Sequence, residues 1–190
     1  MGPGDQGTPV SDKLAGVVHL FAVPDLDASE AEPVADEDDD YDELMKAAGR
    51  FLSRRSHSEA ELRQKLGRRS DPAVIDRVVA RLYELELLDD AAFAAAWVEE
   101  RGDKKGRRAL ESELRGKGVA SDVIAEALSG LDEVQRSGAV ELATRYLRRV
   151  SHKPLREQAS AIQQMLARRG YDYEVAEAAV TQVLPPEGWD

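Results

Sequence analysis

The chain contains no cysteine, which excludes a disulfide framework, a thiolate metal site and a cysteine nucleophile. Aromatic residues are scarce, and the frequent Ala, Leu, Val and Glu residues favour helices over strands. The longest apolar run, Leu14 to Val23, is broken by His19 and falls short of the roughly 20 residues that a membrane helix needs. No basic segment of the kind that opens a signal peptide precedes it, so we expect a soluble, cytoplasmic protein.

Catalytic signatures are also missing from the sequence. There is no glycine-rich phosphate loop, no GxSxG motif and no paired-histidine zinc helix. The histidines His19, His57 and His152 are too far apart in the sequence to suggest a cluster. We therefore expect a protein that is not an enzyme and that needs no cofactor and no metal.

Acidic residues are concentrated at the N-terminal end. Residues 1–43 hold thirteen acids and one base, whereas residues 44–190 hold 24 acids and 25 bases. The glycines, prolines and acids of residues 1–41 predict a mostly disordered tail, because such a segment buries too little apolar surface to offset the entropy of ordering. Leu14 to Val23 is the exception, as a short strand, a docking peptide or a transiently ordered stretch.

One pattern of apolar residues occurs three times after the tail. Leu62 and Leu66, Leu110 and Leu114, and Ile162 and Leu166 are pairs at helical spacing, and successive pairs lie 48 and 52 residues apart (Leu66 to Leu114 to Leu166). A second amphipathic segment follows each pair. Units of this kind bury their apolar faces by stacking on their neighbours, and arrays of them usually bind a partner.

Helix start signals divide the first of these units into three helices. We expect a first helix from Asp42 to about Ser56. Ser58 and Glu61 form a capping box that begins a second helix, which runs to about Arg69. Asp71-Pro72 starts a third helix, since proline at the first helical position loses no needed hydrogen bond.

The later units carry similar signals. A basic loop, Gly102 to Gly106, separates two expected helices, and Gly118 is expected to end the second of these in the left-handed conformation. Ser121 is the expected cap of the next helix. Gly170 ends the middle helix of the last unit, and Pro185-Pro186 closes the array.

These signals predict an all-α protein of nine helices. We expect three tandem three-helix repeats that form an elongated curved array, preceded by the acidic, disordered tail. The predicted segments are the tail 1–41, repeat 1 at 42–88, repeat 2 at 89–131, repeat 3 at 132–184, and a C-terminal tail at 185–190.

Basic residues are the best candidates for partner contacts, because clustered cations can bind phosphates or an acidic protein surface. The predicted binding residues are Arg54, Arg55, Arg63, Arg68, Lys104, Lys105, Arg107, Arg108, Arg115 and Lys117. Other basic residues that lie near one another in the sequence, outside this set, are Arg50, Arg101, Arg145, Arg148, Arg149, Lys153 and Arg156.

Their positions on the helices separate these cations into expected partner contacts and cations that the helix dipole already explains. Arg108 and Arg115 are seven residues apart, so they share a helix face opposite Leu110 and Leu114. Neither has a basic counterpart in the first repeat, which favours a specific contact. By contrast, Arg68-Arg69, Lys117 and Arg168-Arg169 occupy matching places at helix C-termini, where the helix dipole favours a cation.

Five stretches of the sequence resemble the RecX regulators of the bacterial RecA recombinase. Two of them together are the most specific: LLDDAAFA at Leu87 to Ala94 and KGRRALESELRGKGV at Lys105 to Val119. Glu86 stands where the family usually has glycine. The remaining stretches are SEAELRQKL from Ser58, IAEAL from Ile124 and ARRGYDYEVAEAAV from Ala167.

The resemblance spans about residues 44–184 and implies three tandem three-helix repeats, in agreement with the periodicity. It implies a non-enzymatic protein that binds the RecA–DNA filament and damps its recombinase, ATPase and coprotease activities, in DNA repair, recombination and the SOS response. The expected partners are the RecA filament and single-stranded DNA, with double-stranded DNA left open. We expect a monomer that does not bind membranes.

A DNA-binding transcription regulator of the helix-turn-helix type is the alternative, because three-helix units with short turns share that outline. Its recognition helix would span Ala73 to Leu85. That segment offers Arg77 and Arg81 but no Asn or Gln for base edges, so direct readout of DNA sequence would be thin.

Overall fold

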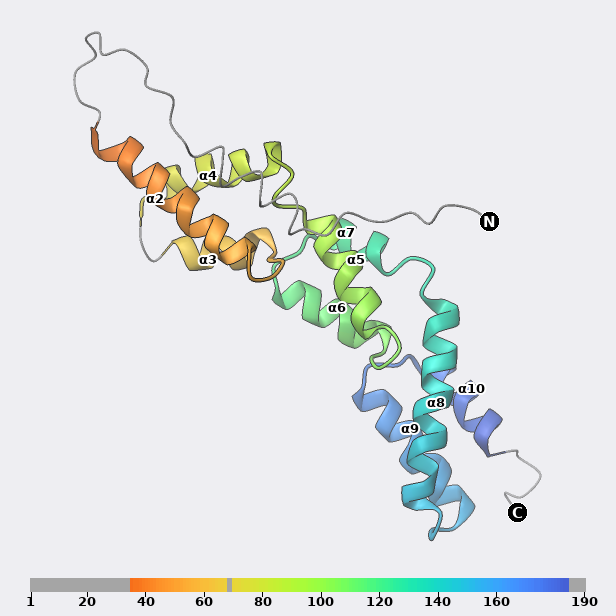
Figure 1. Ribbon diagram of the computed structural model, residues 1–190. Helices are drawn as coiled ribbons and strands as arrows, with labels where there is room; N and C mark the ends of the chain where they lie inside the picture. Colours follow the sequence, from red (N-terminus) through yellow and green to blue (C-terminus); the bar gives the residue numbers. More distant parts are fainter. Residues whose placement is uncertain (1–34, 68–69, 185–190) are drawn as a thin grey trace, which may run out of the picture. The chain divides into compact units, whose positions relative to one another are not determined.

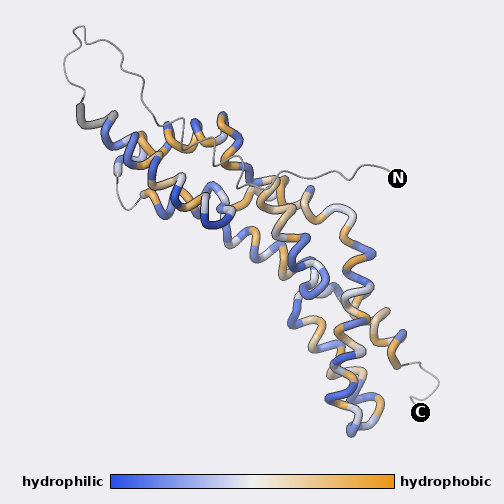
Figure 2. Tube along the Cα trace, viewed as in Figure 1, coloured by the Kyte–Doolittle hydropathy of each residue, from blue (hydrophilic) through white to orange (hydrophobic). Residues whose placement is uncertain are grey.

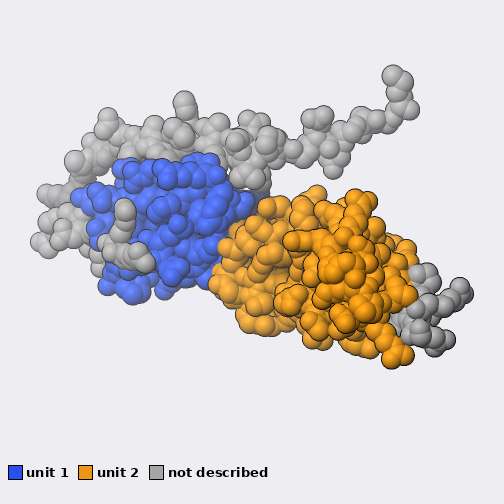
Figure 3. Space-filling view, turned by 90° about the horizontal axis from the view of Figure 1, so that it is seen from below, with its two compact units in different colours: residues 1–89 blue, residues 90–190 orange. Residues whose placement is uncertain are grey.

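The computed structural model describes residues 35–67 and 70–184, with side chains from Asp39 onward. Within these ranges the chain forms nine helices and no strand, as the sequence predicts (Figure 1). It divides into two compact units, unit 1 at residues 1–89 and unit 2 at residues 90–190 (Figure 3). The stretch Leu14 to Val23, Pro185-Pro186 and most of the predicted acidic tail lie outside the described residues.

The described part of unit 1 contains three helices, α2 (Ala35–Leu52), α3 (Glu59–Leu66) and α4 (Pro72–Glu84). The Ser58 hydroxyl accepts a hydrogen bond from the Glu61 amide at 3.2 Å, which confirms the predicted start of α3. The Asp71 carboxylate accepts from the Ala73 amide at 2.7 Å, which confirms the start of α4. Each cap satisfies an amide that the first turn of a helix leaves unpaired.

Helix α2 differs from the prediction at both ends. It begins at Ala35, seven residues before the expected start at Asp42, and it ends at Leu52 rather than near Ser56. The predicted disordered tail includes the run of acids from Asp36 to Asp40, which instead lies within the helix. Acidic residues at the N-terminal end of a helix are favoured by the helix dipole, so the same run also suits a helix start.

The core of unit 1 lies among α2, α3 and α4. The predicted stripe of α4, made of Ile75, Val78, Val79 and Leu82, is buried together with Val74. It packs with Leu44 and Ala48 of α2 in one cluster. In Figure 2 the apolar residues gather where the helices of the unit face each other.

Residues 90–184 of unit 2 form six helices, α5 (Asp90–Arg101), α6 (Arg107–Gly116), α7 (Ser121–Ala127), α8 (Asp132–Val150), α9 (Leu155–Arg168) and α10 (Tyr173–Val183). Helices α5, α6 and α7 surround one apolar cluster, and α8, α9 and α10 surround another. Ser121 is the first residue of α7, and the cap is Ala120 without a side-chain hydrogen bond, so the predicted Ser121 cap is wrong.

The three equivalent apolar pairs are the most deeply buried positions of their helices. Leu62, Leu66, Leu110, Leu114, Ile162 and Leu166 are all 0% exposed. Full burial of one such side chain contributes about 1.5–3 kcal/mol. The all-α fold is confirmed on these residues, while the repeat boundaries and the curvature of the array stay predictions.

Positive φ angles end four helices in the described ranges. Gly118 (φ 76°) ends α6 in the left-handed conformation, as predicted. Gly170 ends α9, as predicted, and it does so in the same conformation (φ 84°). Gly130 (φ 72°) follows α7. Glu86 (φ 54°) follows α4 and adopts this conformation without being glycine, at the place where the RecX resemblance expects one.

Within unit 2 the start of α6 abuts the end of α9. The Gly106 amide donates to the Arg169 carbonyl oxygen at 2.9 Å, and the Arg108 amide donates to the Gly170 carbonyl oxygen at 3.1 Å. These bonds pair amides at an N-terminal helix end with carbonyls at a C-terminal helix end, where both would otherwise lack partners. Backbone hydrogen bonds therefore join the second predicted repeat to the third at this point.

Candidate partner-binding surface

The unit 1 candidates lie around the turn between α2 and α3. Arg54 is exposed and has no ion pair among the described residues. Arg55 binds Glu61, with Nη1 2.9 Å from Oε2. Arg63 binds Glu59, with Nε 2.6 Å from Oε1, and also contacts Asp76.

Partial burial would raise the pKa of Glu59, but hydrogen bonds from Arg63 and from the Tyr83 hydroxyl lower it. The Arg63 side chain is therefore held by a Glu59 carboxylate that stays charged at neutral pH. Arg68 lies outside the described residues.

Several cations of unit 2 gather around Trp97 of α5 and its partner Glu113. The Trp97 Nε1 donates to Glu113 Oε2 at 3.0 Å, and Lys105 binds the other oxygen of the same carboxylate. The Lys117 ammonium lies 4.2 Å from the centre of the Trp97 indole ring, and the Arg101 guanidinium lies 3.5 Å from it. Both cations benefit from the ring's negative face.

The pKa of Glu113 is also lowered. Burial works in the opposite direction, but the hydrogen bonds from Lys105 and Trp97 outweigh it. Lys105 and Lys117 thus help to organise this ring-centred cluster. Lys104, by contrast, is exposed and makes a loose pair with Asp103 at 3.6 Å.

Arg107 lies where the start of α6 meets the end of α9, a contact that we call the joint. Its amide donates to the Oε1 of buried Gln135 at 2.9 Å, and its guanidinium donates to the Leu128 carbonyl oxygen at 2.8 Å. The Gln135 Nε2 donates in turn to the carbonyl oxygens of Gly102 and Lys105 at 2.9 and 2.8 Å. The loop predicted as a binding element is therefore tied into the core of unit 2.

Arg108 and Arg115 project on the side of α6 away from its buried leucines, as predicted. Their side chains are 72% and 62% exposed. Arg108 Nε lies 2.6 Å from Asp172 Oδ1, and Arg115 Nη2 lies 2.5 Å from Glu111 Oε1. Exposed pairs of this kind contribute only about 0–1 kcal/mol, so a phosphate can replace the carboxylate at small cost.

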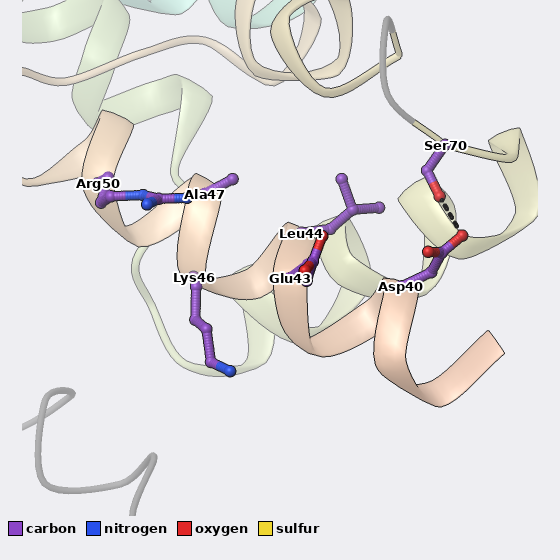
Figure 4. A pocket seen from close by; sticks show the side chains of 7 residues that line it. All are labelled: Asp40, Glu43, Leu44, Lys46, Ala47, Arg50 and Ser70. Atoms are coloured by element: carbon purple, nitrogen blue, oxygen red, sulfur yellow. Dashed lines mark hydrogen bonds between the residues drawn. The ribbon is translucent and has the colours of Figure 1, made fainter. Parts of the chain in front are cut away.

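A hollow of about 280 Å³ in unit 1 is a poorer site. Its lining includes Asp40, Glu43, Lys46 and Arg50 of α2, so its charges are mixed. Ser70 donates to Asp40 across it at 3.0 Å (Figure 4). The carboxylates of Asp40 and Glu43 would repel an anion. The one hydrogen bond between lining residues, from Ser70 to Asp40, does not arrange these side chains around a ligand.

A second hollow, in unit 2, brings together arginines outside the predicted set. Arg145, Arg149 and Arg169 line it, with Tyr146 beside them. The spacing of Arg145 and Arg149, one helical turn apart, is a signal in the sequence that could have pointed to this pair. Arg169 gives no such signal, because a cation at a helix C-terminus is already explained by the helix dipole.

Metal and membrane chemistry find no support in the described parts of the chain. No group of three or more His, Asp or Glu side chains there is placed to hold a metal ion. None of the helices described is both long enough and apolar enough to cross a bilayer.

Fold and surface together define an all-helical protein built from three-helix units with exposed cations. Two family models match it, "RecX, first three-helix domain" over residues 45–82 and "RecX, second three-helix domain" over residues 89–128. These ranges reach from within α2 to the end of α7.

Individual relatives agree with the family models. The chain is 43% identical over 145 residues to the regulatory protein RecX of Mycobacterium ulcerans (strain Agy99), which spans 73% of this chain and 83% of that protein. It is 39% identical over 143 residues to the regulatory protein RecX of Thermobifida fusca (strain YX), over 73% and 77% of the two chains. The crystal structure of RecX from Lactobacillus salivarius superimposes with a TM-score of 0.73 at 25% identity, over 77% of this chain and 97% of that one. The chain belongs to the RecX family of regulatory proteins.

Proposed function

We propose that this protein is a non-enzymatic cytoplasmic regulator that binds the RecA–DNA filament and mainly inhibits its recombinase, ATPase and coprotease activities. Membership of a family of regulatory proteins is the observation that carries the proposal. The exposed cations of both units support it, because a nucleoprotein filament presents phosphates to any protein that binds it.

The candidate residues contribute unequally to this proposal. Arg54 is exposed without an ion pair in the described ranges, and Arg115 pairs only with an exposed carboxylate on its own helix. Arg107 and Lys105 are held by contacts within unit 2, so we assign them mainly to the fold. Arg55, Arg63, Lys104, Arg108 and Lys117 remain proposed contacts for RecA or DNA.

The helix-turn-helix alternative gains little support from α4. The Arg77 guanidinium lies 5.1 Å from the centre of the Tyr41 ring, and Arg81 binds Glu84 with 2.8 Å between Nη1 and Oε2. Both side chains are engaged beside their own helix rather than extended for base contacts. A strong preference for one duplex sequence at physiological salt would favour this alternative.

The test is a titration of the full chain into RecA on single-stranded DNA, with ATP hydrolysis and co-sedimentation as readouts. We expect inhibition at substoichiometric to stoichiometric amounts, and weaker inhibition by Arg54→Glu and Arg115→Glu. Arg136→Glu is the matched control, because Arg136 is an exposed arginine on α8 outside the candidate set. No inhibition and no co-sedimentation by the wild-type chain would overturn the proposal.

A further inference from the structure

The second hollow lies between α8 and α9 and is built from both helices. Leu142, Arg145, Tyr146 and Arg149 come from two successive turns of α8, while Met165 lies in the last turn of α9 and Arg169 follows that helix. Leu142 and Met165 are buried and form its apolar floor, and the three arginines are exposed. Its volume is about 170 Å³.

The lining of this hollow is unbalanced in charge. Arg145 binds the exposed Glu141 with 3.3 Å between Nη2 and Oε1. Arg149 and Arg169 have no ion pair within the described residues. Like charges one helical turn apart repel each other, so the pair Arg145 and Arg149 opposes folding. A bound anion would relieve that repulsion.

The size and chemistry of the hollow narrow the choice of anion. Pockets for drug-sized ligands usually hold about 300–1,000 Å³, so this hollow suits one compact group. Guanidinium groups offer planar forks that match the oxygens of a phosphate. Tyr146 and the apolar floor add a surface on which a sugar or a base can lie.

We propose that this hollow binds a phosphate group of a nucleic-acid backbone, with Arg145, Arg149 and Arg169 as the ligating residues. The inference deepens the proposed function and rests on it, since it assigns part of the DNA contact to the helices α8, α9 and α10. Single-stranded DNA is the favoured occupant, because combined arginine and aromatic contacts are how proteins hold unpaired strands. An acidic peptide would use the arginines but has less need of the aromatic ring and the apolar floor.

The arginines of this region allow a closely matched experiment. Arg148 adjoins Arg149 in the last turn of α8, and Arg168 adjoins Arg169 at the end of α9, but neither lines the hollow. The double variants Arg149→Gln/Arg169→Gln and Arg148→Gln/Arg168→Gln therefore remove the same charge from neighbouring positions at the same helix ends. All four side chains are exposed, and circular dichroism verifies that both variants fold.

The readout is the affinity of the full chain for a fluorescein-labelled oligothymidylate, measured by anisotropy across salt concentration. We expect Arg149→Gln/Arg169→Gln to bind about tenfold more weakly. In a plot of log affinity against log salt concentration, the magnitude of the slope should decrease by about 0.7 for each phosphate that the variant no longer neutralises. We expect Arg148→Gln/Arg168→Gln to change affinity by less than about threefold, through long-range charge alone.

Equal decreases in affinity for the two double variants would overturn the proposal, as would a wild-type chain that does not bind the oligonucleotide. Poly-glutamate serves as the competing probe. A decrease confined to poly-glutamate binding would assign the hollow to acidic protein segments and would also overturn it. Arg149→Lys/Arg169→Lys keeps the charge but removes the forks, so we expect an affinity between those of the wild type and the glutamine variant.

The same proteins added to RecA filaments separate this proposal from the proposed function. If the wild type inhibits RecA but the two double variants bind the oligonucleotide equally well, the proposed phosphate site is refuted and the proposed regulatory function stands. Oligonucleotide binding that depends on Arg149 and Arg169, without any effect on RecA, would retain the site and remove the regulator.

Discussion

Arg108 of α6 binds Asp172, the residue before α10, with 2.6 Å between Nε and Oδ1 across 64 positions of sequence. Because the arginine side chain is 72% exposed, this pair contributes little to stability. The joint between α6 and α9 is held mainly by the backbone bonds of Gly106 and Arg108 behind it. Arg108 can therefore exchange Asp172 for a partner's phosphate while the joint stays closed.

The first prediction concerns the closeness of that joint. A Cβ on Gly106 would lie 2.0 Å from the Tyr171 nitrogen and 2.1 Å from the Gly170 carbonyl carbon, both backbone atoms. We expect Gly106→Ala to lower the free energy of unfolding by roughly 3 kcal/mol or more, since the two helix ends must separate. Chemical denaturation measured by circular dichroism tests this.

Gly116→Ala is the control for that substitution. A Cβ there meets nothing within 4 Å, and Gly116 is the last residue of the same helix, α6. We expect no loss of stability, or a gain of up to about 1 kcal/mol from the better helix propensity of alanine. Equal destabilisation by both substitutions would contradict the close packing at Gly106.

The second prediction concerns Gln135, whose buried amide bonds two backbone carbonyls of the loop before α6 and the amide of Arg107, the first residue of α6. Gln135→Leu removes all three hydrogen bonds and leaves buried donors and acceptors unpaired. We expect a loss of about 2–4 kcal/mol in the free energy of unfolding. The exposed Gln164 of α9 provides the control, and Gln164→Leu should change stability by less than about 0.5 kcal/mol. A small effect of Gln135→Leu would show that the loop does not depend on this side chain.

Some features of units 1 and 2 can be predicted from the sequence, and others cannot. The repeated pairs such as Leu62 and Leu66 are predictable, because helical spacing alone identifies a buried face. The structural role of the Gly102 to Gly106 loop is not predictable, because its hydrogen-bond partners Gln135 and Arg169 are distant in sequence and carry no local signal. A basic loop looks the same in sequence whether its backbone is free or bonded.

Candidate binding residues are harder to predict for a related reason. Sequence supplies the positions of cations but not those of the carboxylates that reach them from other helices, as Asp76 reaches Arg63. Arg149 and Arg169 are absent from the predicted set because each alone resembles an ordinary helix-end cation. Only folding brings them to one hollow.

The third prediction concerns Glu86, whose φ of 54° lies in the left-handed region. This conformation costs a non-glycine residue about 1–2 kcal/mol, and glycine adopts it freely. We expect Glu86→Gly to raise the free energy of unfolding by up to about 1 kcal/mol, since glycine also makes the unfolded chain more flexible. Thermal unfolding of the full chain measures it.

Gly130, after α7, offers the reverse substitution. Its φ is 72° and a Cβ would meet nothing within 4 Å, so Gly130→Ala changes the backbone preference without a clash. We expect a loss of about 1 kcal/mol in the free energy of unfolding. Stabilisation by Gly130→Ala together with destabilisation by Glu86→Gly would argue against strain at these helix ends.

The fourth prediction concerns pH. Burial lowers the pKa of His57, although its hydrogen bond to the Arg55 carbonyl oxygen at 2.9 Å opposes the shift. The unfolded chain therefore takes up a proton at a higher pH than the folded chain does. Stability is fully present above the usual histidine pKa of 6.5 and is lost as the pH falls through 6.5 towards the lower folded value.

Urea denaturation at pH 7.5 and pH 5.5 measures this dependence. We expect His57→Asn to reduce the difference in stability between the two pH values, because the titrating group is gone. His152→Asn, at an exposed histidine after α8, is the control for the substitution of histidine by asparagine itself. A wild-type chain that is equally stable at both pH values would refute the assignment.

The last prediction concerns the acidic N-terminal segment. Because α2 begins at Ala35, a deletion of residues 1–34 leaves α2 whole, and the deleted residues carry six acids and one base. We expect these charges to compete with nucleic acid for the exposed cations, so their deletion should tighten oligonucleotide binding at low salt and matter less at high salt. A second variant of full length, with the six acids replaced by Asn or Gln, separates charge from bulk. If charge is the cause, both variants bind more tightly than the wild type and match each other, whereas an unchanged affinity at low salt would dispose of the competition.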